Sequence, residues 1–249
     1  MTNTLSPETL VLLNHYLHFK IGTAHCSVPY VNNKTVGARG ALAVHVGKGS
    51  PLELTHEIRD MLFKHKISAD TLTNETLKKM LVEHNLGIDC SGFVYHLLNT
   101  EMIATGRTPL KKHISFIQAR GLFGKMNAVL HPAKATGVLT LVDNVNSHIV
   151  ALADVAPGDF ITLVDNSGEG ERDHILLIHE VISENSKTKM IHYSHSVAYP
   201  EDGLYGTGVR QGRIDTLDSS GSILSAQWSE QLIFNRAQKS HTEIRRLKK

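Results

Sequence analysis

The spacing of apolar residues differs between the two halves of the chain. In the first half, apolar residues recur at helical intervals in four stretches, so we expect helices over about 7–19, 51–62, 74–81 and 90–105. In the second half, short apolar runs separated by Gly, Pro and polar residues predict strands over 159–164, 174–182, 189–193, 209–214 and 231–234. Helices that precede strands, without regular alternation, favour an α+β domain with an antiparallel sheet.

Residues 108–154 fit this pattern poorly. Segments 111–120 and 146–153 are candidate helices, whereas 121–137 contains several Gly and Pro residues and is expected to be irregular. The apolar stretch 41–46 suits a short strand or a buried loop.

Composition excludes several classes of protein. The 249 residues carry a formal net charge of +2, which is too small to indicate nucleic-acid binding, and the basic run 245–249 is interpreted as a solvated tail. The N-terminus lacks the basic and apolar regions of a signal peptide, and no apolar run approaches the ~20 residues of a membrane span. We therefore expect a cytoplasmic protein as encoded, although export by another route stays open.

The most informative stretch is Gly87–Val94, which reads GIDCSGFV. Asp89 is a suitable N-cap, so Cys90 would lie in the first turn of a helix, where the helix dipole and free N–H groups stabilise a thiolate. The other cysteine, Cys26, lacks such a context and is expected to be structural. Two cysteines do not make a disulfide framework.

A nucleophilic thiol needs a base, and the base needs an orienting partner. His174 begins a long apolar strand, and a hairpin would bring His192 of the next strand near it. His195 is the alternative third residue, and His179 is expected on the opposite face of its strand from His174. No cofactor is expected.

A metal site is the alternative use of these side chains. It would combine Asp173 with His174, His192 and His195. No His-Glu-x-x-His or paired Cys-x-x-Cys motif supports it, so no metal is expected.

GIDCSGFV resembles the nucleophile motif of the NlpC-type cysteine peptidases, which are cell-wall endopeptidases and amidases with a minimal papain-like fold. Further segments resemble the family in the same order: 22–31, with Pro-Tyr-Val at its end, Pro-Gly-Asp-Phe at 157–160, 174–178 and 189–192. The resemblance implies that N-terminal helices, including the nucleophile helix, pack on a C-terminal antiparallel sheet. It implies one domain over 1–249, with insertions at about 32–86 and 107–155.

The resemblance also implies roles for individual residues. Cys90 would be the nucleophile, His174 the general base and His192 the orienting group. Tyr30 would form the oxyanion site with the Cys90 backbone N–H, and Asp89 and Ser91 are further candidates for oxyanion or substrate contacts.

The implied reaction is cleavage of an amide bond through an acyl-thioester, on a peptide or peptidoglycan-fragment substrate. Two alternatives stay open: acyl transfer of the transglutaminase type on the same site, and a non-catalytic binding module. The oligomeric state is not predicted.

Overall fold

The computed structural model describes residues 1–32, 42–165, 173–185, 187–216 and 221–248. Residues 33–41 of the first predicted insertion lie outside this part. The described helices are α1 (Pro7–Leu17), α3 (Pro51–His65), α4 (Asn74–Glu83), α5 (Cys90–Ala104), α6 (Gly121–Leu130), α7 (Pro132–Ala135), α8 (Val138–Val142), α9 (Gly203–Gly206) and α10 (Gln231–Lys239). The described strands are β1 (Thr2–Thr4), β2 (Phe19–Ile21), β3 (Ala24–Cys26), β4 (Ser147–Ile149), β5 (Phe160–Val164), β6 (His174–Glu184), β7 (Lys187–Val197), β8 (Gly208–Asp215), β9 (Gln227–Trp228) and β10 (His241–Leu247).

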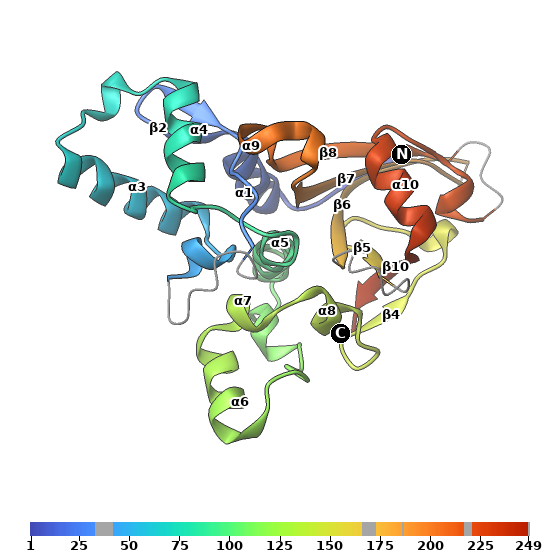
Figure 1. Cartoon of the computed structure of the whole chain (residues 1–249). Helices are drawn as coiled ribbons and strands as arrows, with labels where there is room; N and C mark the ends of the chain where they lie inside the picture. Colours follow the sequence, from blue (N-terminus) through green and yellow to red (C-terminus); the bar gives the residue numbers. More distant parts are fainter. Residues whose placement is uncertain (33–41, 166–172, 186, 217–220, 249) are drawn as a thin grey trace.

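The predicted α+β class with a large antiparallel sheet is confirmed. Seven strands follow the order β4-β10-β5-β6-β7-β8-β9, and β1 pairs with β6 outside this path. Apart from β1, the strands of this sheet come from the second half of the chain, whereas helices α1, α3, α4 and α5 come from the first half (Figure 1). No helix in the described ranges combines the length and apolarity that crossing a membrane requires.

Central strand β6 separates two hydrophobic clusters. Ile175 and Leu177 belong to the cluster formed with α1, α3, α4 and α5, whereas Leu176 and Ile178 belong to the cluster that includes Ile233 of α10. Alternate residues of a strand point to opposite faces, so one strand serves both clusters. Helices α5 and α10 therefore cover opposite faces of β6 (Figure 1).

Each of the four predicted helices begins at a side-chain cap, and the predicted N-cap Asp89 is one of them. Ser6 caps α1, Ser50 forms a capping box with Glu53 at α3, and Asp89 caps α5. Thr73 caps α4. These local side-chain hydrogen bonds explain why the helix starts are readable from the sequence.

Three predictions in the less regular segments were wrong. Residues 121–130 form helix α6 despite their glycines, residues 147–149 form strand β4 rather than a helix, and 111–120 holds only a short 3₁₀ turn at 110–112. The open case 41–46 contains a 3₁₀ helix, Ala43–Val46. Tertiary pairing decides β4, because its partner β10 lies about a hundred residues later.

The C-terminal region differs from the prediction twice. Residues 231–234 belong to helix α10, because Ile233 and Ala237 are buried at helical spacing. The basic run is not a solvated tail, since β10 lies within the sheet between β4 and β5. Its Arg245 donates to Ser147 Oγ over 2.8 Å, and Arg246 binds the Asp159 carboxylate over 2.6 and 2.8 Å.

Candidate functional site

Cys90 is the first residue of α5 and is 5% exposed. Asp89 accepts a hydrogen bond from the Gly92 backbone N–H over 2.6 Å, which fixes the first turn of the helix. Gly92 has to lack a side chain, because a Cβ there would lie 2.6 Å from the Gly47 carbonyl oxygen. The glycine at position 92 therefore lets the segment that contains Gly47 pack against the start of α5.

That segment brings in a buried lysine. Lys48 Nζ donates to Asp89 Oδ1 over 2.8 Å, to Ser91 Oγ over 2.6 Å and to the Thr136 carbonyl oxygen over 2.9 Å. Ser91 Oγ also donates to Asp89 Oδ1 over 3.0 Å. Asp89 and Ser91, candidates for oxyanion or substrate contacts, are thus occupied in holding the start of α5. Lys48 and Thr136 come from the two predicted insertions, which meet beside Cys90.

The segment that carries Tyr30 also reaches this point. Ile88 N–H donates to the Pro29 carbonyl over 3.0 Å, and Tyr30 forms a parallel bridge with Ile88. Tyr30 therefore lies beside the GIDCSGFV segment, although it is 58 positions away from Ile88 in the sequence. Its hydroxyl accepts a hydrogen bond from Asn32 Nδ2 over 3.0 Å.

The structure pairs His174 with His195 and not with His192. His174 Nε2 and His195 Nδ1 are 2.8 Å apart, and both residues are buried. His192 lies 3.6 Å from Glu180 Oε2 and 3.0 Å from Met190 Sδ. Residues 192 and 195 are an odd number apart on β7, so they point to opposite faces of the sheet. The prediction that the hairpin turns His192 toward His174 was wrong, and the alternative residue His195 takes that place.

A carboxylate that the sequence did not reveal extends the pair. Glu230, just before α10, lies with Oε2 3.0 Å from His195 Nε2. Gly212 makes room for it, because a Cβ there would lie 2.6 Å from this oxygen. No motif surrounds Glu230 in the sequence, and only the packing of α10 on the sheet brings it to His195. We call Glu230, His195 and His174 the relay.

The relay determines which histidine nitrogens carry protons. An ionised Glu230 accepts a hydrogen bond, so His195 Nε2 has to carry the proton. The Nδ1 atom of a neutral His195 is then an acceptor, and His174 Nε2 has to donate to it. The remaining nitrogen of a neutral His174, Nδ1, is left with a lone pair and can take up a proton.

Burial controls the charges at rest. Burial, with a smaller contribution from the charge of Asp89, raises the pKa of Cys90 to about 12, although Lys48 and Arg236 oppose the shift. Burial lowers the pKa of His174 well below its usual value, and the charge of Arg236 acts in the same direction, as would a proton added to His195. Burial alone would raise the pKa of Glu230, but the hydrogen bond and charge of His195 outweigh it and lower the pKa. The resting site therefore holds a neutral thiol, a neutral His174 and an ionised Glu230.

The thiol lies next to the beginning of β6. The Ile175 backbone forms a hydrogen bond with the Cys90 sulfur that lowers the pKa of the thiol. His174 is the adjacent residue, but the structure contains no hydrogen bond between its ring and this sulfur. Ile175 therefore links Cys90 to His174, the two residues predicted from the sequence. The Cys90 sulfur and the His174 ring are not hydrogen-bonded to each other at rest.

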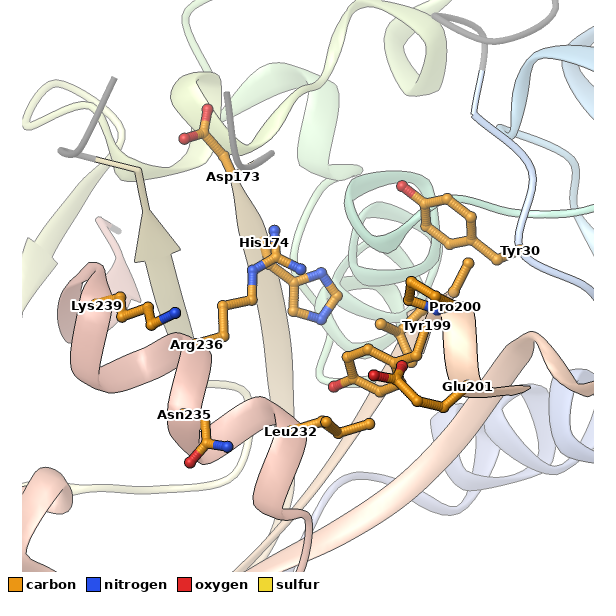
Figure 2. Close-up of a pocket in the computed structure, with 12 residues that line it drawn as sticks. Tyr30, Asp173, His174, Tyr199, Pro200, Glu201, Leu232, Asn235, Arg236 and Lys239 are labelled. Atoms are coloured by element: carbon orange, nitrogen blue, oxygen red, sulfur yellow. The ribbon is translucent and has the colours of Figure 1, made fainter. Parts of the chain in front are cut away.

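Two cavities adjoin this point. One, of about 520 Å³, includes His174, Tyr30 and Arg236 in its lining (Figure 2). The other, of about 280 Å³, includes Cys90, Lys48 and residues of the second insertion. Asp173 lines both.

The residues considered for a metal do not gather around one point. His174 and His195 bind each other through ring nitrogens, and His192 lies with Glu180. Among the described residues, no group of three or more His, Cys, Asp or Glu side chains has a metal-binding arrangement.

No protein-family model matches the chain, and the searches of curated proteins and of solved structures also found no match. The functional argument therefore depends on the geometry of the site and on its motifs.

Proposed function

We propose that the protein is a papain-like cysteine peptidase or amidase with Cys90 as its nucleophile and His174 as its base. The observation that carries this proposal is the relay, which leaves a lone pair on Nδ1 of His174, the residue next to Ile175, whose backbone contacts the helix-start Cys90. A histidine held by a polar partner and placed near a thiol is the arrangement that acyl-transfer enzymes of this kind use.

The proposed reaction begins with a neutral thiol. When an amide substrate enters, His174 Nδ1 takes the proton from Cys90 Sγ, and the thiolate attacks the carbonyl carbon. The Cys90 backbone N–H and Tyr30 hold the resulting oxyanion. The carbon–nitrogen bond then breaks, and His174 returns the proton to the leaving amine. Water, deprotonated by His174, finally hydrolyses the thioester.

The relay stabilises the protonated, positively charged form of the buried His174 imidazole. Each transfer creates a positive charge on His174, which burial disfavours. The ionised Glu230 stabilises that charge through His195, because His174 Nε2–H keeps its acceptor while the imidazolium exists. The His174 ring has to move to the Cys90 sulfur before the proton can transfer, because the two are not hydrogen-bonded at rest. Catalytic hydrogen bonds often form fully only when substrate binds.

The substrate we propose is a peptide or peptidoglycan fragment, which follows from the resemblance of GIDCSGFV to the NlpC-type motif. Purified muropeptides and a tryptic peptide pool are therefore the first substrates to test. Mass spectrometry identifies the new amine and acid, and added amines reveal transfer products in place of hydrolysis.

The test is made in a Cys26→Ser background, so that Cys90 is the only thiol. We expect iodoacetamide to alkylate Cys90 with a pH profile that His174→Ala alters, and we expect Cys90→Ala to abolish turnover. Turnover that survives Cys90→Ala would contradict the proposal. An alkylation rate equal to that of an unfolded-peptide thiol, unaffected by His174→Ala, would indicate a binding module without this chemistry.

A further inference from the structure

Arg236 is a charged residue whose position the proposed reaction does not explain. It is partly buried on α10, and none of the described residues forms a hydrogen bond or ion pair with its guanidinium. Figure 2 shows it beside the His174 ring, in the larger cavity. Because its guanidinium is unpaired and faces a cavity, Arg236 can bind an anionic group that enters that cavity.

Chemistry decides which part of a substrate would meet this arginine. The acyl carbon bonds to Cys90, which lines the smaller cavity, and the leaving nitrogen receives its proton from His174, which lines the larger one. The leaving group therefore occupies the larger cavity. Lys239, three residues after Arg236, also lines that cavity and adds positive charge.

We propose that Arg236 forms a subsite for a carboxylate carried by the leaving amine, an inference that rests on the proposed function. A guanidinium binds a carboxylate through two parallel hydrogen bonds, which orients the ligand as well as attracting it. The bound carboxylate also neutralises the positive charge that opposes protonation of His174. A substrate with this group thus promotes the proton transfer from Cys90.

The experiment compares two alkylating reagents in the Cys26→Ser background. Iodoacetate carries a carboxylate and iodoacetamide does not, so we expect the iodoacetate rate to saturate with concentration and Arg236→Gln to lower the iodoacetate-to-iodoacetamide ratio several-fold. Arg213→Gln removes an exposed positive charge of β8 and is the matched control. A ratio that Arg236→Gln leaves unchanged would overturn the subsite. If both reagents alkylate Cys90 at the rate of an unfolded-peptide thiol, the proposed function is wrong. The iodoacetate-to-iodoacetamide ratio of alkylation rates still tests the Arg236 subsite separately.

Helix α6 carries an independent observation. Its apolar side chains are strongly exposed: Leu122 81%, Phe123 81%, Met126 53%, Val129 53% and Leu130 66%. At 100° per residue these five positions form one stripe, and the buried Ala128 lies on the opposite side. The stripe therefore points away from the protein, and α6 extends from the main body next to α7 (Figure 1).

The surrounding segment is uniformly basic. No Asp or Glu occurs between Met102 and Val142, whereas six exposed basic residues do, namely Arg107, Lys111, Lys112, Arg120, Lys125 and Lys134. Two copies of the stripe would bring these like charges together, which disfavours a dimer through α6. An apolar helix face bordered by basic residues is the pattern of helices that lie in an anionic membrane surface.

We infer that α6 docks on a lipid surface that contains anionic headgroups. The apolar stripe would enter the boundary between headgroups and acyl chains, and Arg120 and Lys125, at the start of α6 and within it, would contact the phosphates. Because the adjoining residues up to 139 line the cavity at Cys90, such docking would place the site close to the membrane.

The test uses the full chain and vesicles of phosphatidylglycerol and phosphatidylcholine in equal parts, with pure phosphatidylcholine vesicles as reference. We expect sedimentation with the anionic vesicles, reduced more than tenfold by the double change Leu122→Ser and Phe123→Ser. Phe63→Ser alters a similarly exposed phenylalanine (88%) on α3, and this variant should bind like the unchanged protein. No sedimentation of the unchanged protein would overturn the inference, as would self-association that the double change removes.

Discussion

Replacing Glu230 with Gln tests whether the relay prepares His174 as a base. Gln can donate from its amide nitrogen to His195 Nε2, which the carboxylate cannot do. His195 would then donate from Nδ1 to His174 Nε2, and the proton of His174 would move to Nδ1. In that tautomer the nitrogen available to Cys90 no longer has a lone pair.

The size of the effect follows from the hydrogen bond that is weakened. A hydrogen bond to a charged group contributes about 1.5–3 kcal/mol, and one between neutral groups about 0.5–1.5 kcal/mol. The substitution therefore lowers the stabilisation of the protonated His174–His195 pair by about 1–1.5 kcal/mol. The Glu230 side chain is 17% exposed, so water screens little of it. This loss corresponds to about tenfold in rate, and the unfavourable tautomer increases it toward about a hundredfold.

The assay measures kcat and KM on the muropeptide that the unchanged protein cleaves, together with the pH profile of Cys90 alkylation. We expect kcat to fall and KM to change little, because Glu230 does not line either cavity. Thermal unfolding checks that the variant folds. A folded Glu230→Gln protein with unchanged kcat and an unchanged pH profile would refute the relay.

Three other outcomes follow from the structure. His195→Ala should abolish turnover, whereas His192→Ala should retain it; the opposite result would restore the original sequence prediction. Lys48→Met leaves a buried carboxylate unpaired and should lower the free energy of unfolding by about 3–5 kcal/mol in a denaturant titration, whereas a loss below 1 kcal/mol would contradict this. Burial and the charge of a neighbouring histidine lower the pKa of His179 to about 4, so the unfolded chain takes up this proton first, near pH 6.5. Stability should therefore fall as pH decreases from about 6.5 to about 4, and His179→Gln should reduce that slope.

Local patterns predicted much of the secondary structure. The starts of α1, α3 and α5 could be read because capping residues act within three positions of one another. The apolar runs that became β5, β6 and β7 could be read because these strands are buried along most of their length. Strand β10 could not, because the basic residues that suggested a solvated tail are neutralised by partners such as Asp159 and Glu243.

The candidate site shows the same division. Cys90 and His174 each stand in a local motif, so the sequence by itself identified them as candidates. The choice between His192 and His195 depended on the register and irregularity of the β6–β7 pairing, which a one-residue shift would reverse.

By itself, the sequence determined the helix that begins at Cys90, the strand that begins at His174 and the α+β class, because these follow from spacing and caps along a short piece of chain. Only the tertiary structure decided that Glu230 and Lys48 belong to the site, since each contacts it from a segment 35 or more positions away. No local pattern encodes such contacts, because they exist only after the helices have packed on the sheet.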